Sequence, residues 1–415
     1  MRIISGTHKG RRINPPKNLP VRPTTDFAKE GLFNILNNKV DFEEIKVLDL
    51  FAGVGGLSYD FAQDSSFEII AANEILPDMA KAYSLNHPEV KMYCTDISDF
   101  GIVDLKKDFN ISEGEIDLVI GGPPCQAYST VGKRLVGDPR GNLFQEYYRV
   151  LKEVKPTAFL FENVKGLLSM QKGKLLKHII SIFESLGYVV SFKVLNSADY
   201  GAPQIRERVI IIGTKSNKSI KYPKPTHQDI SIGQQTIDKT VLPYLTLKDA
   251  LSDLPFIAVG ETGYDYVSEP KNKFQKLMRL NAPEKLMDHN APKNNKNLVE
   301  LMKQLPDGGT PKDLPKELRP KSGFKNTYCR LWWKRPCTTI TRNLSTPSSS
   351  RCIHPKAARP LTTREGARIQ CFPDNYKFYG SRTSKNLQIG NAVPAVLSSV
   401  LKNSIKEHFN SQAKS

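Results

Sequence analysis

The sequence predicts an α/β fold in which a doubly wound, largely parallel sheet is interrupted by a smaller, irregular domain. Short apolar runs typical of buried strands occur at residues 45–50, 68–72, 116–120, 157–161 and 208–213. Helical patterns lie between them, for example at 143–152 and 175–186. Alternating apolar strands and helices are typical of a parallel sheet covered on both faces. After Gly213 the composition changes, because residues 214–356 are rich in lysine, asparagine, proline and serine.

These patterns divide the 415 residues into parts that fit a large domain and a smaller one. Residues 1–45 form a basic, proline-containing arm followed by a helix that begins near Thr25. Residues 46–213 together with 357–415 form the large domain, which includes a helix expected over 357–370. Residues 214–356 form the irregular insert.

The composition narrows the classes of partner. The chain has 60 lysines and arginines against 42 acids, a formal charge of +18. This excess favours nucleic acid as a partner, since cations at phosphates release counterions, although ordinary solubilising charge explains it equally well. No apolar run of about 18 residues is present and the first residues lack signal-peptide features, so we expect a cytoplasmic protein without a membrane span. The cysteines are scattered, which predicts neither a disulfide framework nor a metal site.

Three strand ends predict a site for a nucleoside-bearing cofactor. The segment 49–57 (DLFAGVGGL) joins a strand to a glycine-rich turn, which brings backbone N–H groups close to a ligand. Glu74 follows the second strand, where an acid can bind both hydroxyls of a ribose; a helix cap is the alternative. Asp96 stands where a third strand should end, in reach of an adenine amino group. Either a dinucleotide or S-adenosylmethionine fits this pattern.

A candidate nucleophile follows the third apolar run. The segment 121–129 (GGPPCQAYS) places Cys125 in a rigid turn at the carboxyl edge of the sheet, where such folds hold their substrates. A free thiol has a pKa of about 8.5, so a few per cent is a nucleophilic thiolate at neutral pH. Lone cysteines are usually small buried hydrophobes, but a Pro-Pro-Cys-Gln turn without apolar periodicity fits that poorly.

Two further segments supply polar groups near this turn. The next strand ends in FENV, and adjacent strands can bring Glu162 beside Cys125, although a helix-capping acid is the simpler interpretation without the cysteine. Gln204, Arg206 and Arg208 alternate before an apolar strand and are therefore expected to share one face. Arginine suits carbonyl or phosphate oxygens, and a solvated basic edge is the alternative.

In this order, the segments resemble the motifs of DNA (cytosine-5)-methyltransferases of bacterial restriction-modification systems. The series is DLFAGVGGLS, the Asn73-Glu74 step, TDIS, GGPPCQAYS, FENV, QIRERVIIIG, RPLTTREGARIQCFPDNY and QIGNAVP. The resemblance runs from Lys46 to the C-terminus, apart from the insert. It implies a Rossmann-like S-adenosylmethionine-dependent methyltransferase fold with a smaller irregular target-recognition domain. It also implies methyl transfer to C5 of a cytosine in a specific double-stranded DNA sequence (EC 2.1.1.37).

The resemblance assigns roles to individual residues. Cys125 would add to C6 of a flipped-out cytosine while Glu162 protonates or hydrogen-bonds N3. Arg208 would hold the cytosine O2, with Arg206 on the backbone. The residues expected to line the cofactor site are Phe51, Gly53, Gly55, Gly56, Leu57, Glu74, Ile75, Asp96, Ile97, Pro123 and Asn391.

The N-terminal arm departs from this family. Its segments RIISG (2–6), VRPTTD (21–26) and LFNIL (32–36), continued through DLFAG, resemble the start of bacterial 16S rRNA guanine-N2 methyltransferases. That family carries an Asp/Asn-Pro-Pro-aromatic block, whereas this chain has Gly-Pro-Pro-Cys, which suits carbon methylation. We interpret the arm as a nucleic-acid-binding leader.

Two other functions remain open from the sequence: a cytosine-5 methyltransferase acting on RNA, and a catalytically silent DNA-binding regulator. With the DNA enzyme we expect a cognate restriction endonuclease as a functional partner. We also expect a monomer in the bacterial cytoplasm, associated with the nucleoid.

Overall fold

The computed structural model describes residues 44–124, 143–230, 240–321 and 326–412. The chain separates into two compact units, residues 1–44 with 409–415 and residues 45–408. Nearly all described residues belong to the second unit. The helix expected near Thr25 lies outside the described residues.

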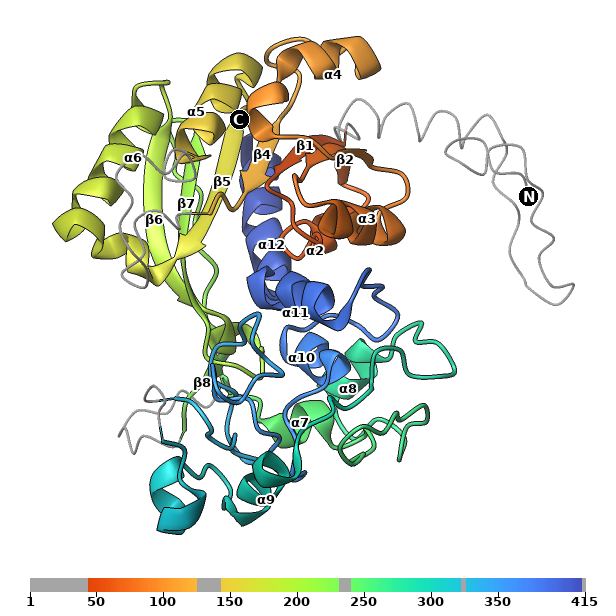
Figure 1. Ribbon diagram of the computed structural model, residues 1–415. Helices are drawn as coiled ribbons and strands as arrows, with labels where there is room; N and C mark the ends of the chain where they lie inside the picture. The colour runs from red at the N-terminus through yellow and green to blue at the C-terminus, as the bar shows by residue number, and fades with distance from the viewer. Residues whose placement is uncertain (1–43, 125–142, 231–239, 322–325, 413–415) are drawn as a thin grey trace, which may run out of the picture. The chain divides into compact units, whose positions relative to one another are not determined.

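The second unit is built on a seven-stranded sheet with the strand order β3-β2-β1-β4-β5-β7-β6 (Figure 1). Strands β1 to β5 pair in parallel, whereas β7 runs antiparallel between β5 and β6. The strands are β1 Ile45–Leu50, β2 Phe67–Asn73, β3 Lys91–Tyr93, β4 Leu118–Gly121, β5 Ala158–Val164, β6 Val189–Asn196 and β7 Glu207–Thr214. The central positions of β1, β4 and β7 are buried because both faces of the sheet are covered there, as the apolar runs predict.

Helices lie on both faces of this sheet (Figure 1). Helices α4 (Ile102–Phe109), α5 (Leu143–Val154) and α6 (Lys174–Glu184) share one apolar core with the strands. Helices α2 (Tyr59–Ala62), α3 (Pro77–Asn86) and the last helix, α12 (Ala395–Gln412), lie on the other side. Lys402 and Lys406 of α12 form ion pairs with Asp64, which lies between α2 and β2. These pairs tie the last helix to the first part of the sheet. No described helix has the length and apolar character needed to cross a membrane.

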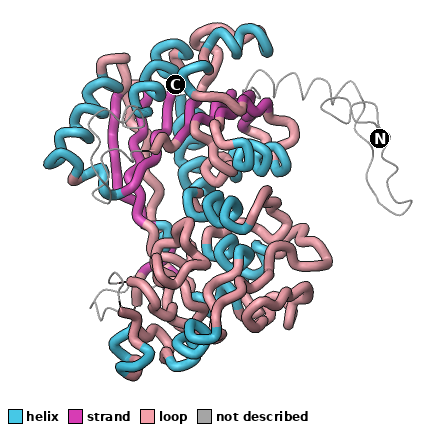
Figure 2. The backbone as a smooth tube through the Cα atoms, viewed as in Figure 1, coloured by secondary structure: helices cyan, strands magenta, loops and turns pink. Residues whose placement is uncertain are grey.

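The insert contains few regular elements, and loops make up most of it (Figure 2). Its elements are β8 His227–Gln228, β9 Leu242–Pro243, α7 Leu247–Leu251, α8 Lys273–Met278 and α9 Lys296–Gln304. Helices α10 (Thr363–Ile369) and α11 (Arg382–Asn391) follow it. Apolar residues of α7, α8 and α10 form a second core, so the chain after residue 357 packs against the insert as well as returning to the sheet.

The helix expected over 357–370 is wrong at its start. Helix α10 begins only at Thr363, because Thr362 and Glu365 form a capping box that fixes the first turn. Before it, Pro360 lacks an N–H and forms an isolated bridge with Ile353. The apolar strand segments, in contrast, are confirmed, and so is the strand expected before Asp96, which is the short β3; the structure adds the edge strand β6.

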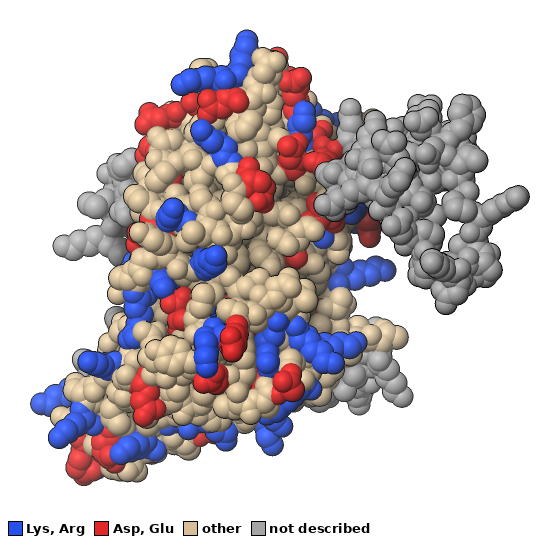
Figure 3. Space-filling view, turned by 90° about the vertical axis from the view of Figure 1, so that its right-hand side faces the viewer, with Lys and Arg blue, Asp and Glu red and all other residues tan. Residues whose placement is uncertain are grey.

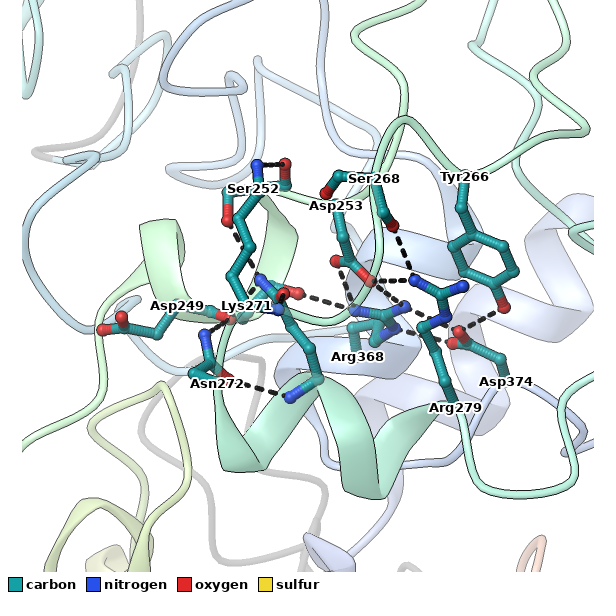
Figure 4. A network of polar contacts seen from close by, with 12 residues as sticks. Asp249, Ser252, Asp253, Tyr266, Ser268, Lys271, Asn272, Arg279, Arg368 and Asp374 are labelled. Carbon is teal, nitrogen blue, oxygen red and sulfur yellow. Dashed lines mark hydrogen bonds and ion pairs between the residues drawn. The ribbon is translucent and has the colours of Figure 1, made fainter.

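A buried ionic network joins α10 to the insert (Figure 4). The Arg368 guanidinium donates to both carboxylate oxygens of Asp253, at 2.9 and 3.2 Å, and of Asp374, at 2.7 and 2.6 Å. All three side chains are almost completely buried. Tyr266 donates to Asp374, and Arg279 stacks on the Tyr266 ring. Removing this guanidinium would break its four hydrogen bonds and leave the two buried carboxylates with only the longer ion pairs, Arg279–Asp253 at 3.6 Å and Arg364–Asp374 at 3.8 Å.

Arg368→Met is therefore expected to lower the free energy of unfolding by about 3–5 kcal/mol, the usual cost of breaking a buried ion pair. Chemical denaturation of the full chain measures it. The matched control is Lys285→Met, which removes an ion pair with Asp265 on the surface and should change stability little. Equal losses in the two variants would show that the network contributes no more than a surface pair.

Candidate active site

The carboxyl ends of the parallel strands bring the predicted site residues to one edge of the sheet. In the register of the strands, Leu50 at the end of β1 pairs with Asn73 of β2 and with Gly121 of β4. Gly121 in turn pairs with Phe161 of β5. The same edge of the sheet therefore holds the glycine-rich turn, Glu74, Pro123 and Glu162. Because β7 is antiparallel, its beginning, with Arg208 opposite Val164, lies at the same edge.

The glycine-rich turn after β1 has a left-handed backbone and two glycines at which a side chain would clash with a neighbouring segment. Gly53 and Gly55 have φ values of +58° and +84°, in the left-handed region, and Phe51 has +53°. A Cβ on Gly55 would lie 2.8 Å from Nε2 of His87, and one on Gly56 would lie 2.4 Å from the Val393 carbonyl oxygen. The contact at Gly56 places the turn against the segment that follows Asn391.

Glu74 is the polar centre of this turn. Its carboxylate accepts hydrogen bonds from the backbone N–H of Gly53 at 2.9 Å and of Leu76 at 2.8 Å. The residue is 8% exposed, and burial raises the pKa of the carboxyl despite these bonds. A carboxylate held in this way keeps lone pairs free for two hydroxyl groups. The glycine cradle and this acceptor together fit a ribose-bearing ligand, as the sequence predicts.

The remaining predicted cofactor residues differ in exposure. Asp96 is exposed and caps the short helix at 97–99, and hydrogen bonds from Ser98 lower the pKa of its carboxyl. Ile75 is 55% exposed, whereas Leu57 and Ile97 are buried. Pro123 is buried, and Asn391 is exposed at the end of α11. The exposed side chains can contact a ligand directly, whereas the buried ones can only support the residues that line the site.

An ion pair occupies the edge between β5 and β7. Nε of Arg208 lies 2.7 Å from Oε1 of Glu162, and each side chain is only 12% exposed. Such low exposure strengthens the interaction by reducing solvent screening. The pair couples an acid that can bind a ring nitrogen to an arginine fork that can bind a carbonyl oxygen. Cys125 directly follows Pro124 and lies outside the described residues.

Two residues that the sequence argument did not single out hold this arrangement in place. Asn163 donates from Nδ2 to the Pro123 carbonyl oxygen at 3.0 Å, so FENV fixes the chain that leads to Pro-Pro-Cys. Gly122 leaves room for the acid, because a Cβ there would lie 2.8 Å from Oε2 of Glu162. Both residues could have been found from the sequence, because each lies within a motif and next to a residue that the motif assigns to the site.

Gly122→Ala is expected to slow the reaction of this site by roughly 10- to 100-fold, because the new methyl group displaces the Glu162 carboxylate from Arg208. The cofactor KM should change little, since the turn and Glu74 are untouched. Gly166→Ala is the control: its Cβ would meet its nearest neighbours only at 3.8 and 3.9 Å. Steady-state rates of the two variants make the comparison, and an unaffected Gly122→Ala enzyme would contradict the role given to this contact.

The expectation for Arg206 is wrong. Arg206 is 1% exposed and Gln204 is 0% exposed, so neither side chain reaches a substrate, and neither belongs to the solvated basic edge that was the alternative. The Arg206 guanidinium donates to the carbonyl oxygens of Ile340, Gly390 and Ala392 at 2.8–3.0 Å. The backbone that it contacts is thus that of the protein itself, so Arg206 is not placed to touch a substrate.

Comparison with known proteins gives two family matches along the chain. The family described as "C-5 cytosine-specific DNA methylase" matches residues 45–407. A second family, described as "Conserved hypothetical protein 95", matches residues 1–62. The two matches overlap over residues 45–62, which contain β1 and the glycine-rich turn.

Curated relatives and solved structures cover most of the chain. The Type II methyltransferase M.DdeI of Desulfomicrobium norvegicum is 36% identical over 88% of this chain and 89% of its own length. M.AgeI of Thalassovita gelatinovora is 31% identical over 87% of this chain and 99% of its own length. The crystal structure of a proposed DNA modification methyltransferase from an E. coli prophage has 26% identity and a TM-score of 0.70, and covers 88% of this chain and 100% of that one. The S. pombe Dnmt2 methyltransferase, at 18% identity and a TM-score of 0.57 over 88% of this chain and 100% of its own, shares the fold.

Proposed function

Because this chain belongs to the C-5 cytosine-specific DNA methylase family, we propose that it has the activity of EC 2.1.1.37 and methylates one specific sequence of double-stranded DNA. Enzymes of this family transfer a methyl group from S-adenosylmethionine to C5 of cytosine. The observation that carries the proposal is the Glu162–Arg208 pair, at the sheet edge where the Pro-Pro-Cys segment begins. An acid and an arginine in this arrangement match the N3 and O2 atoms of a cytosine ring.

In the proposed mechanism, the Cys125 thiolate adds to C6 of a cytosine that has been flipped out of the duplex. Glu162 donates a hydrogen bond or a proton to N3, which lets the ring accept the electron pair, and Arg208 holds O2. When bound, S-adenosylmethionine supplies the electrophilic methyl group for C5. Loss of H5 as a proton to water then restores the C5–C6 double bond and expels the Cys125 thiolate, and N3 returns its proton to Glu162.

The cofactor would lie along the carboxyl ends of β1 to β4. Glu74 would bind the ribose hydroxyls, Asp96 the adenine amino group, and the turn around Gly53 would pass close beneath the ligand. Phe51, Gly55, Gly56, Leu57, Ile75, Ile97, Pro123 and Asn391 would complete the wall. Support comes from the glycine cradle and from the two N–H groups that orient the Glu74 carboxylate.

We assign recognition of the DNA sequence to residues 214–356. The lower part of the face in Figure 3, where the insert lies, carries many lysine and arginine side chains interspersed with acids. Basic groups suit phosphates, and polar side chains on irregular loops suit base edges.

Exchanging residues 214–356 for the corresponding segment of a relative such as M.DdeI is expected to change the sequence that becomes methylated. Bisulfite sequencing of plasmid DNA from cells that express each protein measures this directly. Because α10 shares a core with α7 and α8, a second chimera should extend the exchanged segment to residue 378 in case the first does not fold. Unchanged specificity in a folded, active chimera would assign recognition elsewhere, for instance to the arm.

The biological setting follows from the substrate. We propose a modification enzyme that acts as a monomer on DNA in the bacterial cytoplasm, at the nucleoid, and protects it from a cognate restriction endonuclease. If so, plasmid DNA from expressing cells should resist an endonuclease that cleaves the same DNA sequence only when this sequence is unmethylated.

A further inference from the structure

Three stretches of main chain meet at the buried guanidinium of Arg206. One is its own segment, just before β7 and two residues before Arg208. The second is the end of the insert, through the Ile340 carbonyl oxygen at 2.8 Å. The third is the end of α11, where the carbonyl oxygens of Gly390 and Ala392 accept at 3.0 and 2.9 Å. Asn391 lies between these two acceptors.

Glutamine side chains complete the same junction. Gln204 accepts from the Ile340 N–H at 3.1 Å and donates to the Ile369 carbonyl oxygen and to Gln370. Gln370 in turn donates to the Ile389 carbonyl oxygen at 2.6 Å. The segment before β7 is thus bonded to α10, and through Gln370 to α11. All of these side chains are buried.

The backbones at this junction are in direct contact. A Cβ on Gly390 would lie 2.1 Å from the Arg342 backbone nitrogen and 2.4 Å from the Thr341 carbonyl carbon. The backbone of Cys337 bonds to both neighbours of Gln204: the Ile205 N–H donates to the Cys337 oxygen, and the Cys337 N–H donates to the Pro203 oxygen. These contacts join backbone to backbone, so a shift of one segment is transmitted to the others.

The charge on Arg206 makes the junction sensitive to small displacements. Among the described residues, its guanidinium has carbonyl acceptors but no carboxylate within hydrogen-bonding distance, and burial lowers the pKa of this group. A buried cation is tolerated only while its hydrogen bonds are made. If α11 moved away from the segment before β7, two of the three acceptors would be lost. The three segments are therefore stable only when all of them are in contact with Arg206.

We propose that Arg206 is a positioning residue that couples cofactor binding at Asn391 to base binding by Arg208. The inference rests on the proposed function, which assigns those two contacts. A ligand that fixes Asn391 orders the carbonyls on either side of it, and through Arg206 it orders the start of β7. Binding of the base would in turn tighten the cofactor site, because such coupling is reciprocal.

The test compares two buried arginines with the same chemistry. Arg330 also donates only to carbonyl oxygens, those of Met302, Leu305, His354 and Ala357, but these acceptors lie in or beside the insert. For wild type, Arg206→Lys and Arg330→Lys, the Kd of S-adenosylhomocysteine is measured by calorimetry with and without a duplex that carries the methylated site. The thermal midpoint of each protein is recorded as a measure of general damage.

The wild-type enzyme should bind S-adenosylhomocysteine roughly 5- to 150-fold more tightly with DNA than without it, the usual range of coupling between sites. Arg206→Lys should lose most of this ratio, while Arg330→Lys should keep it at a similar loss of thermal stability. Gln204→Met, which removes bonds of the junction but keeps the buried cation, should reduce the ratio partially. It also serves as the test if Arg206→Lys does not fold.

Equal ratios in the wild type and a folded Arg206→Lys or Gln204→Met variant would overturn the inference, as would a wild-type ratio of one. Equal loss in Arg330→Lys would do so too, because it would show a general effect of instability. Failure of the proposed function is a separate observation, namely absence of 5-methylcytosine in DNA treated with the wild-type enzyme and S-adenosylmethionine.

Discussion

Replacement of Cys125 by serine is expected to abolish methyl transfer, with a fall in rate of more than roughly 10⁴-fold, as when a covalent nucleophile is removed. At neutral pH a serine hydroxyl is almost wholly protonated, whereas a few per cent of a thiol is already thiolate and far more nucleophilic. No acid or arginine in the site can substitute for the bond to C6. Affinity for DNA should remain close to that of the wild type, because the thiol acts after the base has entered the pocket.

A duplex containing 5-fluorocytosine at the target gives a second readout of this variant. Fluorine at C5 cannot leave as a proton, so the wild-type enzyme should remain covalently bound, and denaturing electrophoresis should show the adduct. Cys125→Ser should form none. Cys94→Ser, which alters an exposed cysteine, is the control and should behave like the wild type. Adduct formation or turnover by Cys125→Ser would remove this thiol from the mechanism.

Glu162→Gln is expected to lower kcat by roughly 10²–10⁴-fold, the usual contribution of a positioned acid. Glutamine keeps the size of the side chain and one acceptor for Arg208 but cannot supply a proton to N3. The ring then accepts less charge when the thiol adds. The KM for S-adenosylmethionine should change little, because Glu74 and the glycine-rich turn are separate from this pair.

Glu207→Gln provides the matched control for that substitution. Glu207 lies on β7 next to Arg208 and pairs with Lys165 at 2.7 Å, but its side chain is 40% exposed. Like Glu162, it is an acid in an ion pair close to Arg208. It differs from Glu162 chiefly because its side chain faces solvent. Rates of single-turnover methylation for the two variants separate a catalytic acid from a nearby charge. A similar loss in both would argue that general electrostatics, rather than protonation at N3, determines the rate.

Much of the site could be predicted because parallel strands place their carboxyl ends together. Once the runs at 45–50, 116–120 and 157–161 are recognised as strands, the turn after β1, the Pro-Pro-Cys segment and Glu162 must share an edge. Arg208 joins them for a different reason. Strand β7 runs antiparallel beside β5, and nothing in the apolar run at 208–213 distinguishes that direction from a parallel one.

The role of Arg206 could not be predicted, because its partners lie far away in the sequence. The acceptors at Ile340, Gly390 and Ala392 are 134, 184 and 186 residues from it. Alternation with Arg208 predicts which face a side chain shares but not how deeply it is buried, so it does not distinguish Arg206, at 1% exposed, from Arg208, at 12%. The same limitation explains the helix expected over 357–370, where a bridge between Pro360 and Ile353 overrides the local helical pattern.

The most direct test of the central claim is transfer of labelled methyl groups from S-adenosylmethionine to duplex DNA, with rRNA and tRNA assayed in parallel, followed by nucleoside analysis. We predict labelled 5-methylcytosine in DNA, confined to one sequence, and none in either RNA. Label found only in RNA would contradict the account, and would show that the N-terminal arm, which lies within the second family match, indicates the substrate better than the insert does. Binding of DNA without transfer to any substrate would contradict it as well, in favour of a silent DNA-binding regulator.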